Sequence, residues 1–250
     1  MPLFSTPAII LGTLKLGDAD KLITAYTLAR GRFKGVAAGA RRVKSRFGAS
    51  LEPFTFCHLT ATEKGGERLA RIYQADIVRS FQTLREDWEG LSLGAQMLRM
   101  VERVTPEGDP NSDIFQLLRD GLQVLEDGLK EKRDREMGQA ICFTVFSFRL
   151  VACSGYQPLW DHCLKCRAEL NDHQAYFSAS EGGCLCRICA GGRQNALPPI
   201  SRGTLAYLRF LKKVEGDQVY RLKPSALIRK EVSLLFSRHL AYISGKRSEA

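Results

Sequence analysis

The sequence lacks the signatures that usually identify an enzyme. It contains no Walker phosphate-binding loop, no HExxH, no Gly-x-Ser-x-Gly and no nuclease-like cluster of carboxylates. Asp18 and Asp20 stand in a glycine-led turn, where they are read as turn residues and not as a metal site. We therefore expect a protein that works without catalysing a reaction.

Long apolar runs are also missing. No stretch of 18 apolar residues occurs, and the opening segment 1–17 lacks a basic start and is interrupted by Lys15. We expect neither a signal peptide nor a membrane span. Eight cysteines among 250 residues are too few for a disulfide scaffold, so we predict a cytoplasmic, nucleoid-associated protein with reduced thiols.

Acidic residues are scarce near the N-terminus. Residues 1–50 hold nine Lys or Arg against Asp18 and Asp20, which supplies +7 of the total net charge of +10. A concentrated basic field attracts polyanions and releases counterions when phosphates bind, so nucleic acid is the expected partner. A membrane surface is the competing interpretation, but it needs an amphipathic basic helix. Glycines at 31, 35, 39 and 48 argue against such a helix.

The first 80 residues have the pattern of a small β-barrel. Hydrophobic content of 44% and charged content of 26% are ordinary for a folded chain. Five short segments rich in β-branched and aromatic residues are separated by turn signals, and they cover 8–14, 22–29, 33–38, 53–62 and 69–78. Five such strands suit the OB fold, which recurs in nucleic-acid binding, and an SH3-like barrel is the alternative.

The rest of the chain has helical periodicity. Helices are expected over 84–101, from Asn111 onward, over 136–151, from Ser201 as N-cap to about 213, and over 224–243. The helix over 136–151 is apolar nearly all round, which predicts that it is buried. The fold class is therefore α+β, with an OB-fold nucleic-acid-binding domain over 1–80 and a helical domain over 81–250. A zinc module is inserted at about 155–197.

Two cysteine pairs carry the clearest chemical signal. Cys163 and Cys166 form one pair, Cys186 and Cys189 form the other, and 19 residues separate them. This is zinc-ribbon spacing, because a two-residue gap turns both thiolates of a pair toward one ion. Four sulfurs close the tetrahedral shell, so we predict one structural zinc ion with no open position for a water. Two disulfides are the alternative interpretation.

Three further residues near these pairs are candidate ligands. Cys184 is able to replace Cys186, but only Cys186 completes a second pair with a two-residue gap. His162 and His173 lie close in sequence, but neither is needed for a full shell. They are therefore expected to be surface residues.

The densest candidate for DNA binding is a basic loop bracketed by Gly39 and Gly48. It contains Arg41, Arg42, Lys44, Ser45 and Arg46. Arginine forks two hydrogen bonds onto phosphate oxygens, lysine adds a mobile charge, and serine adds a neutral bond. Phe33, Phe47, Phe54 and Phe56 lie nearby in sequence, and any that reached the surface would stack bases, although most are expected in the core. The alternative is a merely solvated charge run.

These residues resemble a known family. Gly39-Ala40-Arg41-Arg42, then Ser45-Arg46-Phe47-Gly48 and Leu51-Glu52-Pro53-Phe54, resemble the N-terminal domain of the bacterial recombination mediator RecO. Gly155-Tyr156-Gln157-Pro158 before the first cysteine pair, and Gly182-Gly183 before the second, resemble the zinc segment of that family in the same order. The resemblance runs from about residue 8 to the C-terminus.

The resemblance implies a non-enzymatic function in DNA repair and recombination. It implies binding of single- and double-stranded DNA, annealing of complementary strands, and action with RecR to load RecA on DNA covered by single-strand-binding protein. It places the DNA-binding positions at Arg41, Arg42, Lys44 and Arg46, and the zinc ligands at Cys163, Cys166, Cys186 and Cys189. Ala38 stands where the family commonly has a basic residue, and Arg30, Arg32 and Lys34 are the candidates to compensate.

Two other classes of function fit parts of the pattern. One is a zinc-stabilised nucleic-acid-modifying enzyme, which would change labelled DNA or RNA covalently. The other is a zinc-ribbon RNA-binding or transcription factor, which competition between single-stranded DNA, structured RNA and promoter duplex would identify. The contact surfaces for RecR and single-strand-binding protein, the oligomeric state and any DNA sequence preference do not follow from the sequence.

Overall fold

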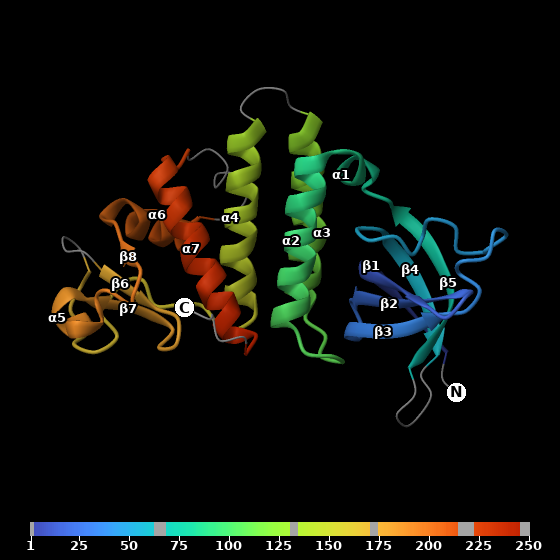
Figure 1. Cartoon of the computed structure of the whole chain (residues 1–250), viewed down its shortest axis with the longest axis horizontal. Helices are drawn as coiled ribbons and strands as arrows, with labels where there is room; N and C mark the ends of the chain where they lie inside the picture. Colours follow the sequence, from blue (N-terminus) through green and yellow to red (C-terminus); the bar gives the residue numbers. More distant parts are fainter. Residues whose placement is uncertain (1–2, 63–68, 131–134, 171–174, 215–222, 246–250) are drawn as a thin grey trace. The chain divides into compact units, whose positions relative to one another are not determined.

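The structure is a computed structural model that describes residues 3–62, 69–130, 135–170, 175–214 and 223–245. The chain divides into two compact units, Met1–Lys132 and Arg133–Ala250. The predicted domain boundary near residue 80 falls between the barrel and the first helix. The boundary of the two units lies further along the chain, between α3 and α4 (Figure 1).

The first unit begins with a closed five-stranded barrel. Its strands are β1 (Leu3–Leu16), β2 (Asp20–Thr27), β3 (Gly31–Ala37), β4 (Phe56–Thr62) and β5 (Ala70–Arg79). They pair in the order β1-β2-β3-β5-β4, and β1 closes the barrel on β4. Every pairing is antiparallel except β3 with β5. This confirms the predicted barrel, whose arrangement is OB-like.

Alternation along the strands builds the barrel core. In β3, every second residue is buried, and Phe33 and Ala37 point inward. Ile10, Ile23 and Ile72 come from three other strands and are completely buried beside them. The connection between β3 and β4 also contributes Phe47, Leu51 and Ala40 to this core, so it is anchored at several points along its length.

Three helices follow the barrel in the first unit: α1 (Gln82–Glu86), α2 (Trp88–Val104) and α3 (Ser112–Lys130). Sequence periodicity predicted one helix where α1 and α2 lie. Asp87 separates them, because its backbone is extended and its side chain caps α2 by accepting a 2.8 Å bond from Gly90 N. Asn111 caps α3 in the same way, as its side-chain oxygen accepts from Asp113 N and Ile114 N.

The connection between α2 and α3 packs on the hairpin of β2 and β3. The Tyr26 hydroxyl donates to Asn111 O at 3.4 Å, and burial raises the pKa of this phenol to about 12. Gly31 has a φ of 60°, and a Cβ atom there would lie 2.0 Å from Asp109 O. Only glycine therefore fits at the point where the two segments meet.

The second unit combines helices with a small sheet. Its elements are α4 (Arg135–Cys153), β6 (Ala175–Ser178), β7 (Gly183–Cys186), α5 (Arg187–Ala190), η1 (Gly191–Arg193), β8 (Pro199–Ile200), α6 (Arg202–Lys213) and α7 (Ala226–Ile243). The sheet has the order β7-β6-β8. Ser201 caps α6 as predicted, and its backbone N and hydroxyl both donate to Glu231 of α7.

Helix α4 packs against α7 in the core of this unit. Phe148 and Phe236 form an edge-to-face pair with ring centroids 6.4 Å apart. Among the described residues, α4 is the one helix long and apolar enough to cross a membrane, but 56% of its apolar window is buried within the protein. The burial agrees with the prediction of a core helix.

We predict that Gly31→Ala destabilises the first unit by more than about 2 kcal/mol, because a left-handed backbone costs a non-glycine residue about 1–2 kcal/mol and the new Cβ also displaces Asp109. Gly17→Ala is the matched control, since Gly17 has a φ of 57° with nothing within 4 Å of its Cβ position. Urea unfolding of both variants gives the two losses. Equal losses would show that the connection moves aside without cost.

Candidate nucleic-acid interface and metal centre

The predicted basic loop is a surface feature of the barrel. Arg41, Arg42, Lys44 and Arg46 are all exposed, between the ends of β3 and β4. None of these four side chains forms an ion pair within the described part of the chain. Their positive charges are therefore available to an anionic partner. We call these four residues the basic loop cluster.

Local hydrogen bonds give the loop a defined backbone. Arg41 N donates to Ala19 O at 2.9 Å, and its side chain donates to Gly17 O at 2.8 Å, which joins the loop to the turn between β1 and β2. The guanidinium of Arg46 lies 5.1 Å from the ring centroid of Phe47, in cation–π range. The cluster is thus held on a loop attached to the barrel.

Ser45 and the four aromatic residues near the loop are less exposed than the basic loop cluster. Ser45 is half-buried, and its hydroxyl accepts a 3.3 Å bond from Phe47 N within the turn. Phe33, Phe47 and Phe54 are buried, and Phe56 is half-buried against Phe115 with ring centroids 6.0 Å apart. The expectation that most of these rings lie in the core is therefore met.

Three other predicted cationic residues lie at the start of β3 and already have neighbours. Lys34 Nζ is 2.7 Å from Glu107 Oε1, and this hydrogen bond lowers the pKa of the glutamate below its usual value. Arg32 is half-buried, and its charge also favours the ionised glutamate. Arg30 is exposed, with its guanidinium 5.2 Å from the ring centroid of Phe4. Glu107 therefore partly neutralises this group, in contrast to the basic loop cluster.

The four cysteines of the two predicted pairs come together in the second unit. The sulfurs of Cys163, Cys166, Cys186 and Cys189 all lie within 4.8 Å of one another, close enough to share a single metal ion. Cys166 Sγ and Cys186 Sγ, one from each pair, are 3.7 Å apart. Cys163 is buried and Cys166 is exposed, so the cluster lies at the surface with one side covered.

Each pair is turned inward by its own backbone. After the first pair, Arg167 adopts a φ of 62°, and Cys163 N donates to Ala168 O at 2.8 Å, which closes a tight loop. In the second pair, Cys186 caps the short helix α5, and its sulfur accepts a 3.4 Å bond from Cys189 N. Backbone N–H groups that point at sulfur stabilise the thiolate form, which is the form that binds metals.

Other backbone hydrogen bonds act on the acidity of the Cys163 thiol. Burial opposes its ionisation, but hydrogen bonds from the backbone of Cys186, Cys166 and Lys165 outweigh burial and lower the pKa of this thiol to about 6. Cys184 behaves in the opposite way, because burial raises its pKa to about 12. Within the cluster the pKa of Cys189 shifts the other way, to about 12, chiefly because of hydrogen bonds with the Cys186 and Cys166 thiols, so Cys163 is the thiol that ionises first.

The alternative ligands do not join the cluster. Cys184 is completely buried in β7, where it pairs with Phe177 of β6, and its sulfur is not among the four that converge. His162 is exposed and is likewise absent from the described cluster. His173 lies outside the described residues. The described geometry therefore favours Cys186 over Cys184.

Residues that sequence reasoning missed attach the first cysteine pair to α6. Arg209 donates to the backbone oxygens of Trp160, Asp161 and Leu170, at 3.1–3.4 Å. Lys212 forms a 3.0 Å ion pair with the carboxylate of Asp161. No local pattern indicates these contacts, because about 40 residues or more separate the partners in the sequence.

Comparison with known proteins covers nearly the whole chain. The family model described as Recombination protein O N terminal matches residues 1–81, and the model described as Recombination protein O C terminal matches residues 85–248. The first match contains the barrel and the basic loop cluster. The second contains the helices from α2 onward and all four clustered cysteines.

Curated relatives match the sequence of this chain along nearly their full length, and each of the following three is named DNA repair protein RecO. The chain is 29% identical to the relative from Desulforamulus reducens, over 99% of this chain and 92% of the relative. It is 30% identical to that from Syntrophus aciditrophicus, over 96% and 91%. It is 31% identical to that from Thermodesulfovibrio yellowstonii, over 97% and 94%. With both family models matched and these identities sustained over almost its entire length, the chain belongs to the RecO family of DNA repair proteins.

Proposed function

We propose that this protein is a non-catalytic mediator of DNA repair and recombination that binds single- and double-stranded DNA and anneals complementary strands. The observation that carries the proposal is the basic loop cluster on an OB-like barrel, four exposed cations that form no ion pair with any residue the structure describes. Membership of the RecO family supports the same function. Each cation of the cluster is able to neutralise a phosphate and release its counterion.

Annealing follows from this electrostatics without an active site. Two DNA strands repel each other through their phosphates, and a cationic surface lowers that repulsion while it leaves the bases free to pair. Arg41, Arg42 and Arg46 suit phosphate contacts because a guanidinium offers paired donors. Arg32 and Lys34 have a secondary role in this proposal, because Glu107 partly neutralises their charge. Arg30 and Ser45 are also secondary, since Arg30 lies beside these two residues and Ser45 adds only a neutral, half-buried hydroxyl.

We infer the partners in this proposal from membership of the RecO family. They are RecR, single-strand-binding protein and, indirectly, RecA, which the protein helps to load on DNA coated by single-strand-binding protein. The cellular site is the cytoplasm, in association with the nucleoid. A strand-annealing assay with and without single-strand-binding protein tests this part of the function most directly.

We infer that the four-cysteine cluster holds one structural zinc ion. Zn–S bonds of about 2.3 Å in a tetrahedron place sulfurs about 3.8 Å apart, which agrees with the 3.7 Å between Cys166 and Cys186. Four thiolates leave no free position for a water molecule or substrate, so the ion has a structural role. The ion joins the segment around the first pair to the segment around the second pair. Arg209 holds the first of these segments, and the β6–β7 hairpin holds the second.

We predict that changing the basic loop cluster weakens DNA binding through phosphate contacts alone. The variant R41A/R42A/K44A/R46A should lower the slope of log affinity against log salt by about 0.7 per lost contact on single strands and about 0.9 on duplex. Annealing should fall in parallel. Thermal stability should stay near that of the unchanged protein, because the four side chains are exposed.

The matched control for this variant removes four exposed charges from the second unit. R187A/K213A/K230A/R238A changes the net charge equally and should leave the salt slope unchanged. Fluorescence anisotropy over a salt series measures both variants. If the slope falls only in the control, the DNA surface lies on the second unit and the proposed role of the loop is wrong.

We predict that the pair of Lys34 with Glu107 restrains DNA binding by β3. Glu107→Gln removes the negative charge and frees Lys34 for a phosphate, so DNA affinity should rise and the salt slope should increase by up to about 0.9 on duplex. The double variant K34A/E107Q should lose that increase. An increase of the same size in both variants would show that Lys34 contributes no contact.

We predict one zinc ion per chain, measured by elemental analysis. Cys166→Ser should abolish zinc binding and lower the thermal stability of the second unit, while the barrel still melts near its original temperature. Cys184→Ala is the control. This buried thiol lies outside the cluster, so the variant protein should keep its zinc. If the Cys184 variant loses its zinc, Cys184 is the ligand and Cys186 is the spare thiol. Zinc retained by the Cys166 variant would show that the proposed four-cysteine site is wrong.

A further inference from the structure

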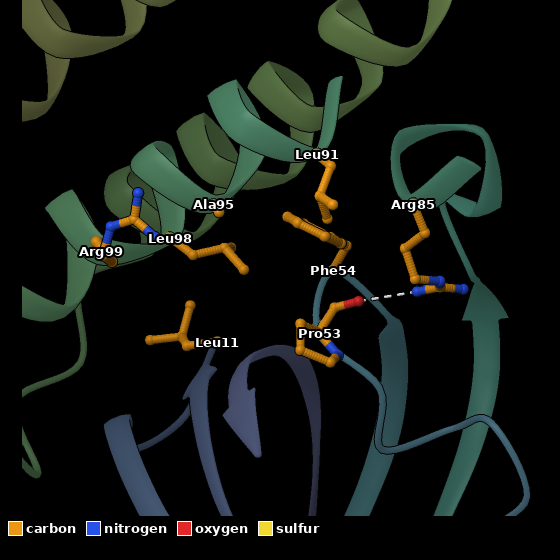
Figure 2. Close-up of a pocket in the computed structure, with 8 residues that line it drawn as sticks. All are labelled: Leu11, Pro53, Phe54, Arg85, Leu91, Ala95, Leu98 and Arg99. Carbon is orange, nitrogen blue, oxygen red and sulfur yellow. Dashed lines mark hydrogen bonds between the residues drawn. The ribbon is translucent and has the colours of Figure 1, made fainter. Parts of the chain in front are cut away.

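A cavity of about 340 Å³ lies in the first unit (Figure 2). Leu11 of β1 and the α2 residues Leu91, Ala95 and Leu98 give it apolar walls, together with Pro53 and Phe54 from the connection that carries the basic loop cluster. We call it the Phe54 pocket. Its other two lining residues are arginines, and no carboxylate from the described residues lines it. The pocket is thus apolar inside and positively charged at its edges.

Irregular backbone on both sides of the pocket creates this space. Leu11 lies where the register of β1 shifts between Ile10 and Gly12, and such a bulge re-aims a side chain. Phe54 has a φ of 73°, which is a rare and strained conformation for a bulky residue. Two backbone bonds hold this conformation, from Phe54 N to Ile10 O at 3.0 Å and from Ile10 N to Thr55 O at 2.9 Å. Strain maintained in this way is typical of binding sites.

Helix α2 accommodates the ring of Phe54 at a glycine. A Cβ atom at Gly94 would lie 2.9 Å from Phe54 Cε1, so a larger residue there would push the ring out of place. The ring is almost completely buried, at 2% exposure. It therefore forms a fixed aromatic wall of the pocket.

The two arginines lie on opposite sides of this apolar interior, as Figure 2 shows. Arg85 donates one bond to Pro53 O at 2.8 Å, which fixes its guanidinium and uses one of its five donors. Arg99 is exposed, and it forms no hydrogen bond or ion pair within the part of the chain that the structure describes. Both groups retain donors for an anion.

We propose that the Phe54 pocket holds one unstacked nucleobase of a bound single strand, with phosphates of the same strand at Arg85 and Arg99. The inference rests on the proposed DNA-binding function. A single strand carries flat rings on a chain of negative charges, and the pocket is an apolar space with a positive charge on each side. A peptide C-terminus carries a single terminal carboxylate beside its apolar side chain and would leave one arginine without a partner.

The pocket would distinguish single strands from duplexes, which a basic loop alone does not do. A base inside a duplex is stacked and paired, so its entry into the pocket breaks both interactions. A base in a single strand has no pairing to lose and enters at a lower cost. The pocket therefore adds a single-strand preference to the non-selective phosphate contacts of the basic loop cluster.

The experiment compares two strands with the same number of phosphates. One is a strand of about ten thymidines, within the site size of one OB fold, and the other is an abasic strand of equal length. Ala95→Leu places a larger apolar side chain in the pocket. Leucine has a high helix propensity, so α2 should tolerate it. Ala206→Leu, exposed on α6 in the second unit, is the matched control. Anisotropy gives the affinities, and thermal unfolding checks that each variant is folded.

The unchanged protein and Ala206→Leu should prefer the thymidine strand. Ala95→Leu should weaken that strand about fivefold or more, the lower end of what one stacked base contributes, and change abasic binding less than about twofold. Arg99→Ala should weaken both strands and lower the salt slope by about 0.7. These three results together support the pocket as a base-binding site.

Other results would overturn the inference, and they separate it from the proposed function. If the unchanged protein binds neither strand, the DNA-binding function itself fails. If it binds both strands equally, or if Ala95→Leu does not change the preference, DNA binding remains and the pocket inference fails. If Ala95→Leu leaves DNA binding intact but abolishes binding of a peptide with an apolar C-terminal residue, the pocket is a peptide site.

Discussion

The parallel pairing of β3 with β5 is the constraint on which the first unit depends. Because β5 lies beside β3, the next strand in the sequence, β4, has to join the barrel elsewhere, and it pairs with β1 and β5. Residues 38–55 must therefore cross from one strand to the other. Phe47 and Leu51 fix this crossing in the core, while the intervening charged residues stay in solvent. One feature of topology thus produces both the basic loop cluster and the Phe54 pocket.

In the second unit, the cysteine cluster and the aromatic core order the same segments. Trp160 lies three positions before Cys163, stacks on Phe177 at a centroid distance of 5.4 Å and contacts Phe236 of α7. The β6–β7 hairpin places Phe177 opposite Cys184 and leads directly into the second pair. A metal ion at the cluster would therefore stabilise the packing of the aromatic residues. The aromatic packing would in turn position the thiols for the ion.

Much of this architecture could be predicted from the sequence, where the determining signals are local. Segments rich in β-branched and aromatic residues between turn signals identified the barrel strands. The N-cap at Ser201 identified α6, and the cysteine spacing identified the four thiols that converge. Strand β1 is longer than predicted, because its first residues are held by pairing with β4 and not by their own composition. The sheet of the second unit was not predicted, since its strands have four residues or fewer.

The unpredicted parts of the candidate sites depend on contacts between distant residues. Arg32 and Lys34 have the composition of a free basic patch, and only the fold brings Glu107 to them. Phe54 gives no sign in the sequence of its left-handed backbone, which Ile10 and Gly94 impose from other elements. Arg209 is similar, because its carbonyl partners become neighbours only when the second unit has folded.

Among the described residues, the basic loop cluster forms no ion pairs, so the side chains proposed to bind anions are not the ones that stabilise the fold. Because these side chains contribute little to the free energy of unfolding, each can be replaced without loss of the barrel. Phosphate binding weakens steeply as salt rises. Under the proposed function, a single charge added or removed at this loop would therefore shift the salt range over which the protein binds DNA, while the scaffold stays the same.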